Sequence, residues 1–136
     1  MLGEKELVQR NVEKLMYYVD FMREGIMRWW KEISDDVVFV VESVVGKEVV
    51  ENLKDPYKLS WVKLFGITSS VVMELDRELV ERFEELEDEL GDDVGYLEDI
   101  QYYCKEIFET LMIVDELYHQ YGKWVGDMMV EFNQWN

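Results

Sequence analysis

The sequence predicts an all-α protein: a single-domain helical bundle of about four to six helices, covering residues 1–136, with a long C-terminal helix. Apolar residues recur at three- and four-residue steps along most of the chain, which is the period of amphipathic helices. The chain has 136 residues, 49% of them hydrophobic, which is enough for one domain with its own core. It contains nineteen valines and no alanine, so packing rather than intrinsic propensity must stabilise its helices.

The first part of the chain is expected to form two helical regions. The apolar pattern predicts an amphipathic helix over about residues 4–33. A Ser-Asp-Asp sequence then supplies N-cap chemistry for a second helix, which continues to about residue 54. Because valines dominate this second region, the alternative is a β-hairpin of residues 37–45 and 48–53 that turns at Gly46. The i, i+3, i+4, i+7 spacing of the valines favours the helix.

An acidic helix is expected in the middle of the chain. The Asp-Pro pair at residues 55–56 marks a break, and residues 57–66 are expected to form a short helix or an irregular stretch. The Thr-Ser-Ser sequence at residues 68–70 predicts the N-terminal cap of a helix over about residues 70–90. The leucines of this segment keep helical spacing and define its core face.

The C-terminal part of the chain is expected to be one long helix or two. Residues 91–95 contain two glycines and two aspartates and predict a turn. From Tyr96 the apolar pattern continues nearly to the end, with Gly122 and Gly126 as the expected position of a bend. The apolar stripe is wider than one contact face needs, which fits either a central helix of the bundle or an oligomer interface.

Charge is distributed unevenly along the chain. The net charge is −17, and residues 74–99 contain thirteen carboxylates and two arginines, whereas the 73 residues before them come to only −2. Such an acidic chain is expected neither to bind nucleic acid directly nor to associate with anionic membranes, and a basic partner or a cation suits it better. With no apparent signal peptide or membrane span and a single cysteine, we expect a cytoplasmic or otherwise intracellular protein, with a host cell as one setting.

Carboxylates in the acidic segment follow a regular stripe. Their steps of four and three residues place them on one face of a helix, away from the leucines, over about 27 Å. One interpretation is a solvated surface that keeps the protein soluble. The other is a docking strip for a basic protein surface, with a nucleic-acid-binding protein as one class of partner, because carboxylates one helical turn apart approximate the spacing of phosphates. The stripe consists of Glu74, Glu78, Glu81, Glu85, Asp88 and Asp92.

A second motif suggests an enzyme as the alternative function. The sequence ELGD at residues 89–92, followed by Tyr-Leu at 96–97, resembles the ExxD half of the MazG-like all-α nucleotide pyrophosphohydrolases. The resemblance implies that Glu89 and Asp92 hold Mg²⁺ against a nucleotide triphosphate, since hard cations need clustered oxygen ligands. The chain lacks the usual EExxE partner motif, and Gly95 stands where the family has a bulky residue. The nearest substitutes for EExxE are Glu48 with Glu51 and Glu74 with Glu78.

Two further residue patterns could form a functional site or could have a purely structural role. Glu116 and His119 have the ExxH spacing of di-iron carboxylate bundles, but His119 is the only histidine, so a symmetric dimer would have to supply a second unit. A partly buried structural histidine is the simpler interpretation. Cys104 lies in the apolar series of the last helix and is expected to be a core residue.

These patterns favour a non-enzymatic interaction module. We expect it to present the acidic helix over residues 74–92 to a basic partner and to form a homo-oligomer, with no cofactor. An inhibitor or accessory protein of a virus or mobile element fits the compactness, acidity and unusual composition. The alternatives are the Mg²⁺-dependent pyrophosphohydrolase and a virion or assembly subunit with an apolar contact made by the last helix.

Overall fold

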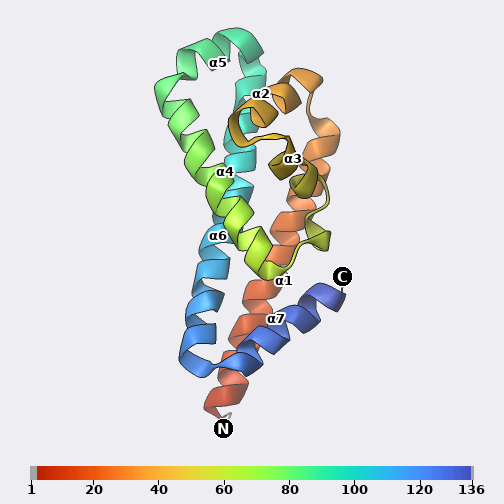
Figure 1. Ribbon diagram of the computed structural model, residues 1–136, viewed down its shortest axis with the longest axis vertical. Helices are drawn as coiled ribbons and strands as arrows, with labels where there is room; N and C mark the ends of the chain where they lie inside the picture. The colour runs from red at the N-terminus through yellow and green to blue at the C-terminus, as the bar shows by residue number, and fades with distance from the viewer. Residues whose placement is uncertain (1–2, 136) are drawn as a thin grey trace.

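The structure is a computed structural model that describes residues 3–135, and the side chains of residues 3–130. It confirms the all-α prediction: the described chain is helical almost throughout and contains no strand (Figure 1). The elements in chain order are α1 (Glu4–Glu32), α2 (Asp35–Val45), α3 (Lys47–Lys54), the 3₁₀ helix η1 (Pro56–Lys58), α4 (Trp61–Glu81), α5 (Phe83–Leu90), the 3₁₀ helix η2 (Gly91–Val94), α6 (Gly95–Tyr121) and α7 (Lys123–Trp135).

The long helix α6 is the central element of the bundle. It runs antiparallel to α1 on one side and packs against α4 on the other, as Figure 1 shows. Its buried residues on the two sides include Leu97, Cys104, Ile107 and Val114, all fully enclosed. The width of the apolar stripe is therefore explained largely by packing on two neighbours, which is one of the two explanations that the sequence allowed.

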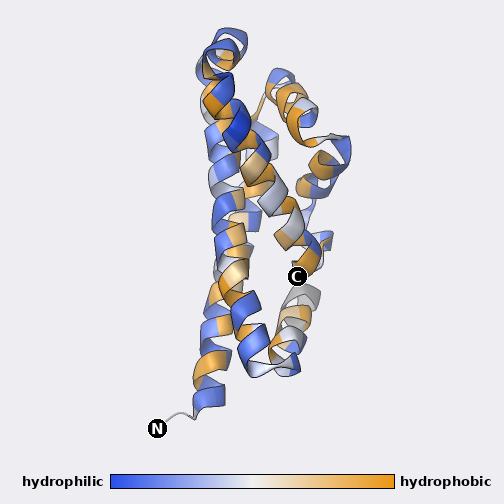
Figure 2. Ribbon diagram, turned by 60° about the vertical axis from the view of Figure 1, so that its left-hand side comes forward, coloured by the Kyte–Doolittle hydropathy of each residue, from blue (hydrophilic) through white to orange (hydrophobic). Residues whose placement is uncertain are grey.

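The remaining helices cover the ends and one side of this core. Helix α3 packs beside the C-terminal half of α1, α2 packs against α4 and α3, and α7 folds back across the N-terminal part of α1. Helix α5 and η2 connect α4 to α6 at the opposite end of the molecule, far from the N-terminus. In Figure 2 this end is mostly hydrophilic, with apolar residues on its inner side.

The valine-rich region forms helices, so the hairpin alternative is wrong. The region is nevertheless divided, because Gly46 has a φ of 93° and ends α2 through a hydrogen bond from its N–H to the carbonyl of Glu42. Ser34 caps α2 as predicted, accepting a hydrogen bond from the N–H of Val37. Gly46, which the hairpin alternative placed at its turn, thus marks a turn between two short helices.

The expected start of the acidic helix at residues 68–70 is also wrong. Helix α4 begins earlier, at Trp61, where Ser60 is the N-cap and accepts a hydrogen bond from the N–H of Lys63. Thr68 is fully buried inside α4, and its hydroxyl donates to the carbonyl of Leu64 four residues earlier at 2.8 Å. Serine and threonine hydroxyls can donate a hydrogen bond to a carbonyl of the preceding turn in this way, so such residues need not be helix caps.

Long-range polar contacts attach the connecting segments to α1. Trp29 donates its indole N–H to the carbonyl of Tyr96 at 3.1 Å, and Trp30 donates to the carbonyl of Leu53 at 3.0 Å. Neighbouring tryptophans therefore hold the start of α6 and the end of α3 against the same turn of α1. No helix in the described part of the chain is long and apolar enough to cross a membrane.

A buried arginine fixes η1 on the side of α1. Arg23 is fully buried; its guanidinium donates to Asp20 at 3.0 Å and lies 4.5 Å from the ring centroid of Tyr57. The hydroxyl of Tyr57 in turn donates to the carbonyl of Asp20 at 3.3 Å. Burying a charge is costly unless it is paired, so this ion pair and ring contact set the position of η1. The sequence signal was that Arg23 falls among the apolar positions of α1.

The close approach of α1 and α6 depends on Gly25. A Cβ placed there would lie 2.7 Å from Cε1 of Tyr103, well inside contact distance. Replacing Gly25 with alanine should therefore lower the free energy of unfolding by about 1–3 kcal/mol through overpacking, despite the better helix propensity of alanine. Urea denaturation measures this change.

Gly66 is the matched control for this substitution. It lies inside α4, where a Cβ would meet no atom within 4 Å. Gly66→Ala should stabilise the protein by about 0.5–1 kcal/mol through helix propensity alone. If Gly25→Ala stabilised the protein to the same degree, the close contact with Tyr103 would be refuted. In the double variant with Tyr103→Ala, the cost of Gly25→Ala should largely disappear.

Candidate functional site

The predicted carboxylate stripe is broken at Arg82. Helix α4 ends at Glu81, and Arg82, with φ −129° and ψ 24°, separates it from α5. The stripe therefore does not run straight for about 27 Å, as a single helix over residues 70–90 would require. The sequence contains no glycine or proline at this point, so nothing in the pattern indicated the break.

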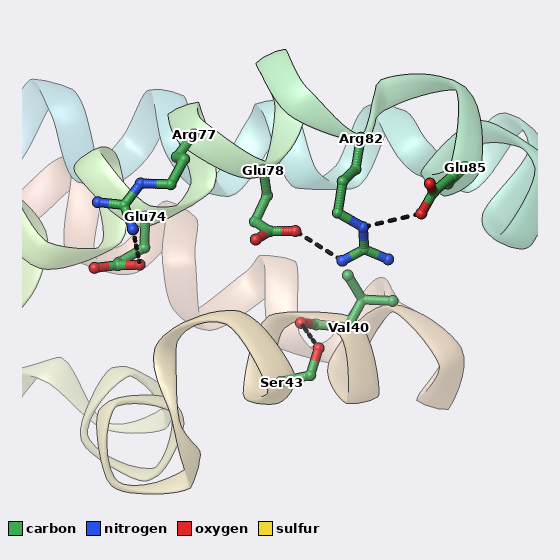
Figure 3. Close-up of polar contacts among 7 residues, drawn as sticks. All are labelled: Val40, Ser43, Glu74, Arg77, Glu78, Arg82 and Glu85. Atoms are coloured by element: carbon green, nitrogen blue, oxygen red, sulfur yellow. Dashed lines mark hydrogen bonds and ion pairs between the residues drawn. The ribbon is translucent and has the colours of Figure 1, made fainter.

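Two of the three stripe carboxylates on α4, Glu74 and Glu78, are paired and partly covered. Glu74 lies 3.7 Å from Arg77, and Glu78 accepts a hydrogen bond from Arg82 at 2.7 Å. Figure 3 shows Glu78 and Arg82 on the side of α4 that faces α2, with their ion pair above the buried side chain of Val40. These carboxylates are half-buried and partly neutralised, so they offer little to an external partner.

Arg82 joins the two helices electrostatically. Its Nε donates to Glu85 at 3.1 Å, and its Nη1 donates to Glu78. One guanidinium therefore bridges the last turn of α4 and the first turn of α5 (Figure 3). Hydrogen bonding to these two carboxylates raises the pKa of Arg82 further above its ordinary value. In the sequence Arg82 is recognisable only as one of two positive charges in the acidic segment, and its bridging role becomes visible only in the structure.

The remaining carboxylates gather at one end of the bundle. Residues 83–94, which form α5 and η2, contain seven carboxylates and no basic residue. All of them except the half-buried Asp93 are exposed. Leu86 and Leu90 anchor this segment to the core, which leaves its outer surface acidic. We call this surface the acidic tip; its exposed members are Glu84, Glu85, Glu87, Asp88, Glu89 and Asp92.

The structure thus divides the six predicted stripe residues. Glu74 and Glu78 belong to the paired surface of α4, and Glu81 is exposed at the end of that helix. Glu85, Asp88 and Asp92 belong to the acidic tip, together with carboxylates that lay off the predicted stripe. Their common feature is position at the α4–α6 connection, which spacing within one helix does not reveal.

The metal-site alternative gains no support from the geometry. Glu89 is exposed at the end of α5 and Asp92 is exposed on η2, while Glu48 and Glu51 lie on the outer surface of α3. Among the described residues, no group of three or more histidine, cysteine or acidic side chains is placed to hold a metal ion. The upstream carboxylates that the pyrophosphohydrolase resemblance requires do not gather around Asp92.

The single histidine is not part of a cluster either. His119 is largely exposed, and its Nδ1 lies 2.8 Å from the carbonyl of Asp115 in the preceding turn. The simpler interpretation of a partly buried structural histidine was therefore wrong about burial. Glu116 is exposed on α6.

A surface hollow elsewhere has a mainly apolar lining. It lies between η1 and α7, has a volume of about 470 Å³ and is lined mainly by Tyr57, Leu59, Trp61 and Val130. Among its described lining residues there is no carboxylate, histidine or cysteine. The described lining of this hollow therefore suits an apolar contact better than metal binding.

Comparison with protein-family models, with curated proteins and with solved structures finds no match for this chain.

The two parts of the predicted stripe should respond differently to neutralisation. Glu78→Gln with Glu85→Gln removes both partners of Arg82 and should lower the thermal midpoint. Glu87→Gln with Asp88→Asn removes exposed negative charge near the C-terminal end of α5 and should raise it slightly, because the helix dipole and like charges disfavour acids there. Circular dichroism melting compares the two variants, which carry the same net charge. Equal shifts would show that Arg82 does not hold the α4–α5 junction.

Cys104 is enclosed in the core, as expected from its place in the apolar series. Burial raises the pKa of its thiol above the ordinary value, so the native thiol should not react with Ellman's reagent at mildly alkaline pH. One equivalent should react after unfolding in guanidinium.

The matched control moves the only thiol to the neighbouring exposed position. The variant Cys104→Ser with Lys105→Cys should react within the mixing time while native, because residue 105 faces solvent. Rapid labelling of the unmodified native protein would contradict the packing of α6 between its neighbours.

Proposed function

We propose that this protein is a non-enzymatic interaction module that binds a basic protein surface through its acidic tip. The observation that carries the proposal is the arrangement of exposed carboxylates on α5 and η2, where no basic residue lies within residues 83–94. The basic residue that flanks this segment, Arg82, is already held by Glu78 and Glu85. Apart from Glu85, no carboxylate of the tip forms an ion pair with a described residue, so a basic partner would meet negative charge that these residues do not neutralise.

The energetic properties of the tip support this role. Like charges crowded on a short helix disfavour folding slightly, so the arrangement has no evident benefit for stability. The summed field of such a cluster instead attracts a partner of opposite charge and speeds association. Because α5 spans only about 12 Å, the tip suits a compact basic patch better than a long groove. A nucleic-acid-binding protein, whose basic surface ordinarily contacts phosphates, is one class of partner that fits.

The proposal is tested by capture from the native cell with a tip variant and a charge-matched control. The tip variant is Glu84→Gln, Glu87→Gln, Asp88→Asn and Glu89→Gln, which spares Glu85 and hence Arg82. The control neutralises four exposed glutamates far from the tip, Glu6, Glu13, Glu24 and Glu48. Both variants change the net charge from −17 to −13 by removing four charges.

We expect the wild type and the control to capture the same basic protein, and the tip variant to lose at least about 90% of it, consistent with several lost charge contacts. Capture should also weaken with added salt, since exposed charges are screened beyond about 8 Å at physiological ionic strength. Mass spectrometry identifies and quantifies the captured protein. Equal loss in both variants would show that net charge alone, and not the tip, governs binding.

We also propose self-association, supported by a second surface. Although α6 is central, Tyr102, Met112 and Ile113 on its outer side remain 42–52% exposed. Large apolar side chains gathered on one helix face are typical of protein interfaces.

A further inference from the structure

Exposed aromatic residues gather where α1 and α6 lie side by side. Phe21 on α1 is 60% exposed and Tyr102 on α6 is 52% exposed. Tyr18 lies between the helices, and burial together with a hydrogen bond to Glu106 raises its pKa to about 12. The rings of Tyr102 and Tyr103 make an edge-to-face contact, with centroids 5.9 Å apart. The cluster therefore spans both helices and forms one apolar surface rather than scattered residues.

The α1 side of this surface is basic. From Arg10 to Arg28, positions spaced by three or four residues form a stripe of basic and aromatic side chains, exposed except at the buried Gly25, that includes no carboxylate, although α1 has as many acids as bases. The next position along the stripe, Glu32, is acidic. The acids of α1, such as Glu13 and Asp20, lie on other faces. We call this the basic stripe; it consists of Arg10, Lys14, Tyr17, Phe21, Gly25 and Arg28.

The α6 side of the same surface is acidic. The corresponding stripe on α6 also advances by three or four residues, and it contains carboxylates and apolar side chains but no base. None of its carboxylates forms an ion pair with a described residue. We call this the acidic stripe of α6; it consists of Asp99, Tyr102, Glu106, Glu109, Ile113 and Glu116.

Antiparallel packing sets which residues lie at the same height on the two helices. Gly25 is beside Tyr103, and near the other end Glu4 accepts a hydrogen bond from Tyr121 at 3.1 Å. Between these points, a residue of α1 and a residue of α6 lie at the same height when their two numbers add up to about 125. This holds because both helices rise about 1.5 Å per residue. The heights that follow place Arg10 with Glu116, Lys14 with Glu109, and Arg28 with Asp99.

From this arrangement we infer that the protein forms a two-fold homodimer through the α1–α6 face, with the basic stripe of each copy on the acidic stripe of the other. The two-fold axis runs parallel to the helices. It lies in the interface, in front of the line midway between α1 and α6 of each copy. A rotation about this axis preserves height, so Lys14 meets the partner's Glu109 and Arg28 meets the partner's Asp99. The aromatic cluster of one copy covers that of the other at the centre.

The charge pattern selects a second copy over other occupants. A partner must offer carboxylates to α1, bases to α6 and apolar side chains between them, and the face itself has this composition. A two-fold axis across the helices would place the acidic stripes against each other, which is unfavourable. A nucleic acid would suit Arg10 and Lys14 but would meet the carboxylates of α6 directly.

This inference specifies the proposed self-association, since Tyr102 and Ile113 belong to the acidic stripe of α6, and it concerns a different face from the acidic tip. The acidic tip lies at one end of α6, and an axis parallel to the helices keeps the two tips at the same end of the dimer. The dimer therefore presents two acidic surfaces side by side to a basic partner. The two proposals are tested separately, since the tip variant leaves the α1–α6 face intact and should remain dimeric.

Charge reversal tests the dimer. Light scattering coupled to gel filtration, at about 100 μM protein and physiological salt, should give the wild type twice the chain mass of 16.4 kDa. The variant Lys14→Glu with Arg28→Glu should be monomeric, and so should Asp99→Lys with Glu109→Lys, each with a dissociation constant raised at least about 100-fold. Mixed in equal amounts, the two variants should form a heterodimer, because each reversed stripe then meets its complement.

Controls separate this geometry from general charge effects. Lys47 and Lys63 are exposed and lie away from the face. The variant Lys47→Glu with Lys63→Glu changes the net charge by the same amount as Lys14→Glu with Arg28→Glu and should stay dimeric. A wild type that stays at 16.4 kDa up to millimolar concentration would overturn the inference. So would variants that remain dimeric, or a mixture that fails to associate. Binding of a labelled single-stranded oligonucleotide that Lys14→Glu with Arg28→Glu abolishes would assign the face to nucleic acid instead.

Discussion

The packing of α6 between α1 and α4 is the constraint on which the rest of the structure depends. Every helix in a chain without alanine carries larger side chains into its contacts, so close approach needs special positions. Gly25 supplies one, where the ring of Tyr103 occupies the space of a missing side chain. The same part of α1 then holds α3 and the start of α6 through Trp30 and Trp29. Displacing α6 would therefore release both connecting segments together with the core.

Much of the fold could be predicted from hydrophobic periodicity, and the exceptions have local physical causes. The first helix was predicted to within one residue because its apolar pattern is unbroken from Glu4 to Glu32. The valine-rich region was correctly predicted as helix, since spacing outweighs β-branched composition when packing stabilises the helix. The start of the acidic helix was wrongly predicted at Thr68 because a threonine can be either a helix cap or an interior residue. Only its burial distinguishes the two roles. The break at Arg82 had no glycine or proline to mark it.

The candidate surfaces were less predictable from the sequence. Each either combines residues that are distant in the sequence or includes carboxylates whose pairing and exposure the local spacing does not indicate. Spacing alone joined Glu78 and Asp88 in one stripe, whereas the α4–α5 junction pairs the first and exposes the second. The basic stripe of α1 is readable in the sequence but inconspicuous within a chain of net charge −17. Its position beside the acidic stripe of α6 follows only from antiparallel packing of helices about 80 residues apart. Charge composition thus indicated what kind of partner to expect, and tertiary structure was needed to say where.

The position of α6 also orders the events of folding. Helices α4 to α6 are contiguous and pack as a hairpin, so their contacts close at modest entropic cost. The contacts of α1 reach much further, up to the 117 residues that separate Tyr121 from Glu4. During synthesis α1 emerges well before its partner α6, because helices α2 to α5 lie between them in the chain. Its apolar face, with Val12, Met16, Val19 and Ile26, must therefore wait uncovered while most of the chain is made. The interval before α6 appears is the period in which this chain is most exposed to aggregation, and α1 is the segment a chaperone would need to shield.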